Sequence, residues 1–473
     1  MKKNVTFTES KAMIMAMIHS AARKQHVDMT TGSIAGHLVS FAFPLLLGNI
    51  FQQLYNTVDT WVVGNFASNE AFSAVGSVGP IINVLIGLFM GLSTGASAVI
   101  SQFYGAKQAD RVRDAVHTSI MLTLLLSILF TVVGIAFTPF MLRMTKMPEN
   151  VMPEATTNLR IYFAGITGLL FYNMGSAILR SVGDSRRPFY FLVVAALLNS
   201  VLDLLFVVVF RMGVAGVAWA TILAQGISAV LVVISLIRYD DSIRLQIRKL
   251  KLHWDVLRKI FRVGIPAALQ LAITSFSNVF VQSYINHFGP NFMSGWTAYS
   301  KINQLVLLPM QSISLAITTF VGQNLGAGQT ERARKSVGVA FALSVSTSAV
   351  LLLPVLLFAP QLVGFFNPNA EVITFGALLL RMLCPFFLIY CIHDTLGGAL
   401  RGAGNGKVPM FITLGCFVFF RQFYLYVMAN FICNEVVPIA LSFPAGWVLS
   451  SLLTLIYFLR TKLTNNRLVD DNR

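Results

Sequence analysis

Twelve long apolar stretches run through this 473-residue chain, and they constrain its fold more than any other feature. A helix needs about 20 mostly apolar residues to cross the hydrocarbon core of a bilayer. The chain is 56% apolar and 11% charged, whereas soluble domains carry about 25% charged residues. We therefore expect an all-α membrane protein with twelve transmembrane helices. The expected spans are residues 38–63, 78–103, 116–138, 157–179, 188–210, 214–237, 263–287, 297–322, 337–358, 372–398, 409–432 and 437–459.

The distribution of charge predicts the orientation of these spans. The net charge is +16. If the first residue lies inside, the inside segments sum to +17, the outside segments to −2 and the spans to +1. Because Lys and Arg concentrate in cytoplasmic loops, both termini are expected in the cytoplasm. No folded basic face with base-reading residues is evident, so the charge does not indicate nucleic-acid binding.

A polar stretch at residues 238–262 lies near the midpoint of the spans and divides them into two sets of six. We interpret it as a cytoplasmic linker. The other expected regions are a cytoplasmic N-terminal tail (1–35), an N-lobe (36–237), a C-lobe (263–460) and a cytoplasmic C-terminal tail (461–473). A short apolar run at 12–18 fits an interfacial helix or a dispensable tail, and Met29 is an alternative start of translation.

The two halves repeat each other at a nearly constant offset. Residues 179–188 match residues 400–409 at an offset of 221, and the same offset takes Gln102 to Gln323. Pro44 and Asn56 fall on Pro266 and Asn278 at an offset of 222, and the 221 offset also takes Gly105, Ala106, Arg111, Arg113 and Arg160 to Gly326, Ala327, Arg332, Arg334 and Arg381. This pattern indicates duplication of a six-span unit. Six is an even number, so the two lobes form a parallel internal repeat, as in secondary transporters that bind substrate near the midplane between repeats.

Two intramembrane acids in the first half are the strongest functional candidates, because carboxylates in hydrocarbon are costly. Asp59 shares a helical face with Tyr55, and Asp203 follows Asn199 by one turn. Thr221 lies at a similar depth in the sixth span. Burial disfavours a charged carboxylate, so the acids could carry a proton. We predict an ion- or proton-coupling site at Asp59, Asp203, Asn199, Thr221 and Tyr55, with sodium at Asp59, Asn199, Asp203 and Thr221 as the alternative to a proton.

The alternative is that these polar groups only join helices structurally. The repeat argues against it, because the second half lacks them. Asp59, Asn199 and Asp203 correspond to Val281, Phe420 and Tyr424.

Further polar residues occur in other spans. We predict a buried ion pair between Asp394 and Arg421, since intramembrane charges tend to pair, with a second ion or substrate site as the alternative. His393 is expected to be an interior hydrogen-bonding residue. The candidate lining of the substrate cavity is Gln52, Asn56, Asn173, Gln270, Asn278, Asp394 and Arg421. The four cysteines match no zinc or redox spacing, so they are expected to serve packing.

In combination, several motifs resemble the multidrug and toxic compound extrusion (MATE) family from about Gly36 to Leu463. They are Pro44, residues 52–60, residues 102–106, residues 179–188, and Asn199 with Asp203. The resemblance implies two six-helix lobes in a V, alternating access to a central cavity, and export of organic cations and amphipathic drugs driven by protons or sodium. It also implies an N-lobe ion site of the DinF-like branch at Asp59, Asn199, Asp203, Thr221 and Tyr55. The NorM-like branch carries an acid where this chain has Thr274, although Asp394 lies where that branch has another acid.

We therefore expect a cation-coupled multidrug antiporter that is monomeric and lies in a bacterial inner membrane. Its expected partners are drug molecules and lipid, and no cofactor other than the coupling ion is expected. A lipid-linked oligosaccharide flippase is the nearest alternative, but many such proteins have fourteen spans and a strongly cationic cavity. A membrane-embedded enzyme is less favoured, because no nucleophile–His–acid or metalloprotease motif is present.

Overall fold

The computed structural model describes residues 28–144, 148–239 and 242–469, and it contains twelve helices long and apolar enough to cross a membrane. The expected all-α membrane fold is confirmed, and the described residues contain no strand. The principal helices are α2 (Ile34–Phe66), α3 (Asn69–Gly105), α4 (Ala109–Met144), α5 (Met152–Ser181), α6 (Arg186–Asp203), α7 (Gly213–Ile237), α8 (Trp254–Asn286), α9 (Pro290–Gly326), α10 (Thr330–Leu357), α12 (Ala370–Leu383), α13 (Phe387–Gly402), α14 (Lys407–Thr413), α15 (Arg421–Val427) and α17 (Ser442–Arg460). Short helices α11 (Ala359–Phe366) and α16 (Val436–Ala440) precede α12 and α17.

Local sequence signals explain several helix starts. Ser33 and Ser68 cap α2 and α3, with each side-chain oxygen accepting a hydrogen bond from a backbone N–H three residues later. Gly289 adopts a positive φ of 87°, which a residue without a Cβ tolerates, and Pro290 then opens α9. The short apolar run at 12–18 lies outside the described residues.

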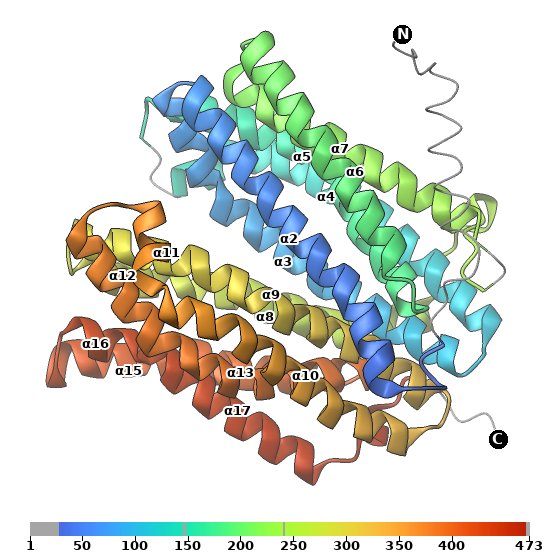
Figure 1. Ribbon diagram of the computed structural model, residues 1–473. Helices are drawn as coiled ribbons and strands as arrows, with labels where there is room; N and C mark the ends of the chain where they lie inside the picture. Colours follow the sequence, from blue (N-terminus) through green and yellow to red (C-terminus); the bar gives the residue numbers. More distant parts are fainter. Residues whose placement is uncertain (1–27, 145–147, 240–241, 470–473) are drawn as a thin grey trace, which may run out of the picture.

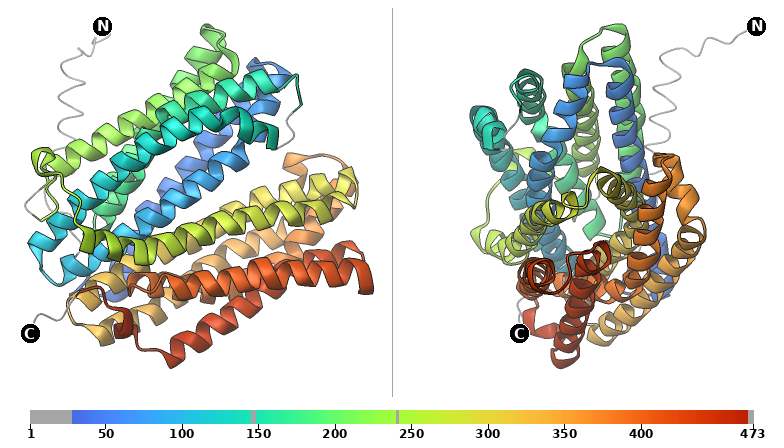
Figure 2. Two further views of the ribbon diagram at one scale, coloured as in Figure 1. Left: turned by 180° about the vertical axis from the view of Figure 1, so that it is seen from behind. Right: turned by 90° about the vertical axis from the view of Figure 1, so that its left-hand side faces the viewer.

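The helices form two lobes that diverge from a common end. Figures 1 and 2 show α2 to α7 in one lobe, the N-lobe, and α8 to α17 in the other, the C-lobe. The lobes lie side by side where the first and last described residues are found, and they diverge toward the opposite end. We refer to the first of these as the termini end.

Two equivalent glutamines join the lobes at the termini end. Gln102 on α3 donates a hydrogen bond to the carbonyl of Gly402 over 2.8 Å, and Gln323 on α9 donates to the carbonyl of Ser181 over 2.8 Å. The glutamines and the carbonyls are each 221 residues apart. The internal repeat therefore appears in the structure as two equivalent contacts between the lobes. We call this pair of contacts the seam.

Glycines allow the backbones to meet in the seam. A Cβ on Gly105 would lie 1.9 Å from the carbonyl oxygen of Gln323, and one on Gly326 would lie 2.0 Å from that of Gln102. No real Cβ approaches an oxygen so closely. The conformation described here therefore requires glycine at both positions.

Residues 463–469 lie against the seam and contact both lobes. The N–H of Leu468 donates to Gln102 Oε1 over 2.7 Å, and its carbonyl accepts from Lys259 Nζ over 2.7 Å. Arg467 donates to the carbonyl of Gly326. Leu468 and Val469 are buried within the N-lobe core. We call residues 463–469 the seam segment.

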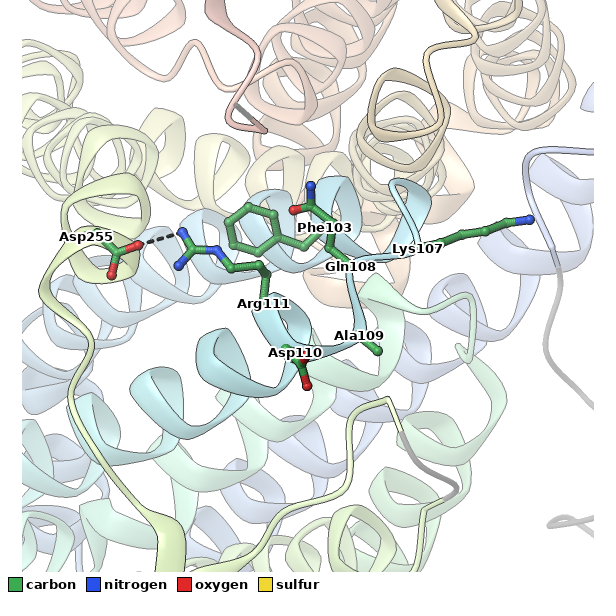
Figure 3. A pocket seen from close by; sticks show the side chains of 7 residues that line it. All are labelled: Phe103, Lys107, Gln108, Ala109, Asp110, Arg111 and Asp255. Atoms are coloured by element: carbon green, nitrogen blue, oxygen red, sulfur yellow. Dashed lines mark hydrogen bonds and ion pairs between the residues drawn. The ribbon is translucent and has the colours of Figure 1, made fainter. Parts of the chain in front are cut away.

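The repeated arginines Arg111 and Arg332 also link the lobes. Arg111 on α4 forms an ion pair with Asp255 at the start of α8, and Figure 3 shows Lys107 pointing away from this pair. Arg332 on α10 donates to the carbonyls of Met29, Thr31 and Gly32, which lead into α2. The open hollow around Arg111 measures about 710 Å³ and is lined by Phe103, Lys107, Gln108, Ala109, Asp110, Arg111 and Asp255. None of the predicted site residues lines it.

Candidate ion-coupling site

A small cavity lies inside the N-lobe between α2, α5, α6 and α7. Its volume is about 30 Å³, which suffices for a water molecule or a small cation, because a single water needs about 10–15 Å³ measured in this way. The lining residues are Gln52, Tyr55, Leu169, Tyr172, Asn173, Leu192, Ala195, Asn199, Thr221, Ala224, Gln225 and Ser228. The cavity therefore combines aromatic and aliphatic walls with hydroxyl and amide groups.

Asp59 on α2 and Asp203 at the end of α6 lie next to each other. Their carboxyl groups are within hydrogen-bonding reach, and the Thr221 hydroxyl reaches Asp59. Asp203 is 0% exposed. Among the described residues, no N–H or hydroxyl group donates to either oxygen of Asp203 or to Asp59 Oδ1. Two carboxylates in contact repel each other unless a proton or a cation lies between them, so this pair requires one.

Within the described part of the chain, Asn199 adds two more buried polar atoms without hydrogen-bond partners, one helical turn before Asp203. It is 2% exposed, and neither its Oδ1 nor its Nδ2 has a hydrogen-bond partner among the described residues. Since Asn199 and Asp203 are four residues apart on α6, their side chains share one face. Asp59 thus contacts Asp203 and Thr221, and Asn199 and Thr221 line the same cavity. Hard cations prefer oxygen ligands of this kind.

The backbone changes immediately after Asp203. Residues Leu204–Val209 adopt a π-helical conformation, which continues the span that begins at Arg186. Short π-helical segments within α-helices are rare and are frequent at functional sites. Here the segment changes the helical register beyond the acid, so Asp203 is the last residue of the regular helix.

The N-lobe part of the predicted site is brought together by the fold. Tyr55, Asn199 and Thr221 line one cavity, and Asp59 contacts Asp203 and Thr221. Of the candidate substrate residues, Gln52 and Asn173 line this same cavity. Sequence reasoning missed Tyr172, Gln225 and Ser228. Gln225 follows Thr221 by four residues, so helical periodicity could have identified it.

The predicted ion pair between Asp394 and Arg421 is wrong. Arg421 instead donates to Ser277 Oγ over 3.0 Å and to Asn278 Oδ1 over 2.8 Å. The charged neighbour of Asp394 is Arg401, seven residues later on α13, and Ser314 lies against both residues. The reason is helix rotation: Asp394 lies on the face of α13 that carries Arg401, whereas Arg421 is directed toward α8.

The remaining candidate substrate residues do not share one cavity with Gln52 and Asn173. Gln270 donates to Thr413 Oγ1 over 2.9 Å, and His393 bonds to Thr413 and Thr454 inside the C-lobe. His393 is therefore an interior hydrogen-bonding residue, as predicted. Asn56 is exposed on α2. The second lobe has Val281 buried where the first has Asp59, and the hydroxyl of Tyr424 donates to the carbonyl of Pro438.

Comparison with known proteins identifies the family of this fold. The sequence profile of the MatE family matches residues 44–205 and residues 266–427, one stretch in each lobe. The chain belongs to the MatE family. The two matched stretches are offset by 222 residues, in agreement with the internal repeat of this MatE protein.

Relatives match the MatE chain over most of its length. It is 28% identical to the "Probable multidrug resistance protein YpnP" of Bacillus subtilis, over 91% of this chain and 96% of that protein. It is 26% identical to the "Probable multidrug resistance protein NorM" of Thermotoga maritima, over 91% and 93%. A MOP superfamily transporter from Pyrococcus furiosus has a similar fold, with a TM-score of 0.87, 23% identity and coverage of 92% and 97%.

Proposed function

We propose that this chain is a proton-coupled multidrug efflux antiporter in which Asp59 and Asp203 carry the coupling proton. The observation that carries the proposal is the contact between two acids in one lobe of a duplicated fold, where, among the described residues, no N–H or hydroxyl group donates to either oxygen of Asp203 or to Asp59 Oδ1. The names of the YpnP and NorM relatives support drug export. Small-molecule drugs and the lipid bilayer are the proposed partners.

The proposed mechanism is a shift between two arrangements of the lobes. When both carboxyl groups are ionised, their repulsion opposes close contact between α2 and α6. A shared proton removes this repulsion and favours the arrangement in which the pair is buried. A bound ion can shift such an equilibrium only if it binds the two arrangements with different affinity. Proton binding to the acid pair thereby favours one arrangement, and drug binding favours the other.

We further propose that the termini end faces the cytoplasm of a bacterial inner membrane. The charge distribution supports this orientation, since basic residues concentrate in the segments at that end. Residues 1–35, 238–262 and 461–473 would then be cytoplasmic, as the N-terminal tail, the linker between N-lobe and C-lobe, and the C-terminal tail. The closed seam makes this an outward-facing arrangement. A monomer suffices, because one chain contains both lobes and the whole acid pair.

Sodium is the alternative coupling ion, with Asp59, Asn199, Asp203 and Thr221 as its ligands. The direct contact of the two carboxyl groups favours the proton, because a shared proton fits between touching oxygens whereas a metal ion holds its ligands farther apart. The DinF-like branch is the proposed place in the family, since its ion site corresponds to these residues. The family membership argues against a membrane-embedded enzyme.

The decisive test is Asp203→Asn in proteoliposomes loaded with a cationic dye, with proton and sodium gradients imposed separately. We expect wild-type efflux to follow the proton gradient and the variant to fall at least about tenfold, with unchanged membrane insertion. Tyr424→Phe is the matched control, because it changes the corresponding position in the C-lobe and should retain efflux. Wild-type efflux by Asp203→Asn refutes the site, and efflux driven by sodium alone refutes the proton.

A further inference from the structure

Arg421 is a buried cation in the C-lobe that the proposed proton pathway does not use. It lies near the middle of the span Lys407–Ile432, between two π-helical segments, and is 4% exposed. Ionisable residues at such depth are costly and mark functional sites unless a partner neutralises them. The nature of its partners therefore decides what Arg421 does.

All the described partners of Arg421 are neutral. Its hydrogen bonds go to the Ser277 hydroxyl and the Asn278 amide oxygen, and its guanidinium lies 4.8 Å from the centre of the Phe443 ring. Nε has no partner in the structure, and no carboxylate of the described residues lies within 4.0 Å. A guanidinium has five N–H donors in a planar fork. Within the described part of the chain, Arg421 is thus a desolvated positive charge that lacks a counter-charge.

The side chains around Arg421 are fixed in place. Ser277 donates to the carbonyl of Phe417, and Gln422 donates to both the hydroxyl and the carbonyl of Ser277. These bonds tie α8 to the span that carries Arg421. Asn278 is exposed on α8, so one partner of the guanidinium lies at the surface of the lobe. A ligand that reaches Asn278 therefore also approaches the guanidinium.

The internal repeat relates this site to the acids of the N-lobe. Arg421 follows Phe420, which corresponds to Asn199, and Asn278 corresponds to Asn56. At the repeat offset Arg421 corresponds to Ser200, three residues before Asp203, so the two lobes carry opposite charges within about one helical turn of equivalent positions. One aromatic ring, that of Phe443, lies against the arginine. Phe443 in turn packs against Trp296 and Trp447 at centroid distances of 5.2 and 6.0 Å.

We infer that Arg421, with Ser277 and Asn278, binds the carboxylate of aromatic zwitterionic substrates. The planar fork of an arginine matches a carboxylate with two parallel hydrogen bonds, and the ring of Phe443 beside it supplies apolar contact for the aromatic part of the ligand. The inference rests on the proposed function, because it extends the substrates from organic cations to molecules that also carry an acid.

The test compares two dyes that differ only at one carboxyl group: rhodamine 110 has a free carboxylate, and rhodamine 123 is its methyl ester. Binding to the purified full-length protein is measured by fluorescence anisotropy. We expect Arg421→Gln to weaken binding of rhodamine 110 at least tenfold and that of rhodamine 123 less than twofold. Arg381→Gln is the matched control, because Arg381 is an exposed arginine in the neighbouring span, and it should leave both affinities unchanged.

Asn278→Asp is a second variant that retains the arginine and its packing. The new carboxylate should neutralise the guanidinium. It should therefore weaken the binding of rhodamine 110 by the same factor as Arg421→Gln. Equal effects of either variant on the two dyes, or no binding of rhodamine 110 by the wild type, overturn the inference. Rhodamine 123 efflux in everted vesicles tests the proposed function separately, because that readout does not require Arg421.

Discussion

At the scale of single residues, we expect the N-lobe site to lower the stability of the folded protein. Apart from the contact between the two carboxyl groups, Asp59, Asn199 and Asp203 contain buried polar atoms that have no hydrogen-bond partner among the described residues. Each unsatisfied buried group costs about 1–3 kcal/mol. Natural proteins retain such costs mainly where function requires them. The two carboxyl groups contact each other, and Asn199, one turn before Asp203, lines the small cavity, which supports a shared role.

Asn199→Leu tests this cost directly. Leucine has the same number and branching of side-chain heavy atoms and no polar atoms, so we expect the free energy of unfolding to rise by about 1–3 kcal/mol, while efflux falls. Thermal unfolding in detergent and dye efflux measure the two effects. Asn324→Leu is the control, because Asn324 donates to the carbonyls of Met29 and Phe320 and its replacement should destabilise the protein. A less stable Asn199→Leu variant contradicts the argument.

The sequence predicted the acids of the candidate site better than their surroundings. Helical periodicity and position along each span suffice to predict that Asp59, Asp203 and Thr221 lie at a similar depth in the membrane. They do not give the rotation of each helix about its axis, and for that reason Arg421 was paired with Asp394 although it is directed toward α8. Tyr172 was also missed, because the neighbour of a given span is decided by tertiary packing.

At the scale of helices, the seam depends on the crossing of α3 and α9. Gly105 and Gly326 occupy equivalent places in this crossing, and each lies against the backbone of the other helix. Closely packed backbones leave no space for an additional methyl group. Substitution at either glycine must therefore separate the two lobes at the termini end.

We expect Gly105→Ala and Gly326→Ala to open the seam to similar degrees. The measurement is maleimide labelling of a cysteine introduced at Ser181, which is 0% exposed and whose carbonyl is part of the seam. Labelling should accelerate at least severalfold in both variants. Gly338→Ala on α10 is the control, since no atom lies within 4 Å of its added Cβ. Unchanged labelling in the seam variants would show that the crossing tolerates a methyl group.

The order and number of the helices were predictable from the sequence, whereas the exact start of a helix and its local changes of helical type were not. All twelve spans follow from apolar length, and their symmetry follows from the repeat. The first turns of α8 were not expected, because Trp254 lies within the polar stretch 238–262. The π-helical residues Leu204–Val209 were also missed, since their apolar sequence does not differ from that of an ordinary span.

At the scale of the whole molecule, the described polar contacts that join the lobes gather toward one end. The glutamines, the two arginines and the seam segment all contact both halves there. The ribbons diverge toward the other end (Figure 2). A transition to the opposite arrangement must break this set of contacts, so the seam segment stabilises the arrangement described here.

Truncation after Asn466 should shift the balance of the two arrangements. It removes Arg467, Leu468 and Val469, and with them the contacts to Gln102, Lys259 and Gly326. We expect faster labelling of the cysteine at position 181 and unchanged membrane insertion. Truncation after Val469 is the control, because it keeps all these contacts. Equal labelling of the two truncated proteins would exclude a stabilising role for the segment.

The paired glutamine contacts also bear on how such a chain could arise. Each lobe supplies one donor and one acceptor to the other, which is the self-complementary pattern of a homodimer with C2 symmetry. A single six-span polypeptide with this glutamine and glycine could have built the same contact twice. After gene fusion, the two copies would no longer have needed identical sequences. One copy would then have retained the acids, and the other would have acquired an arginine.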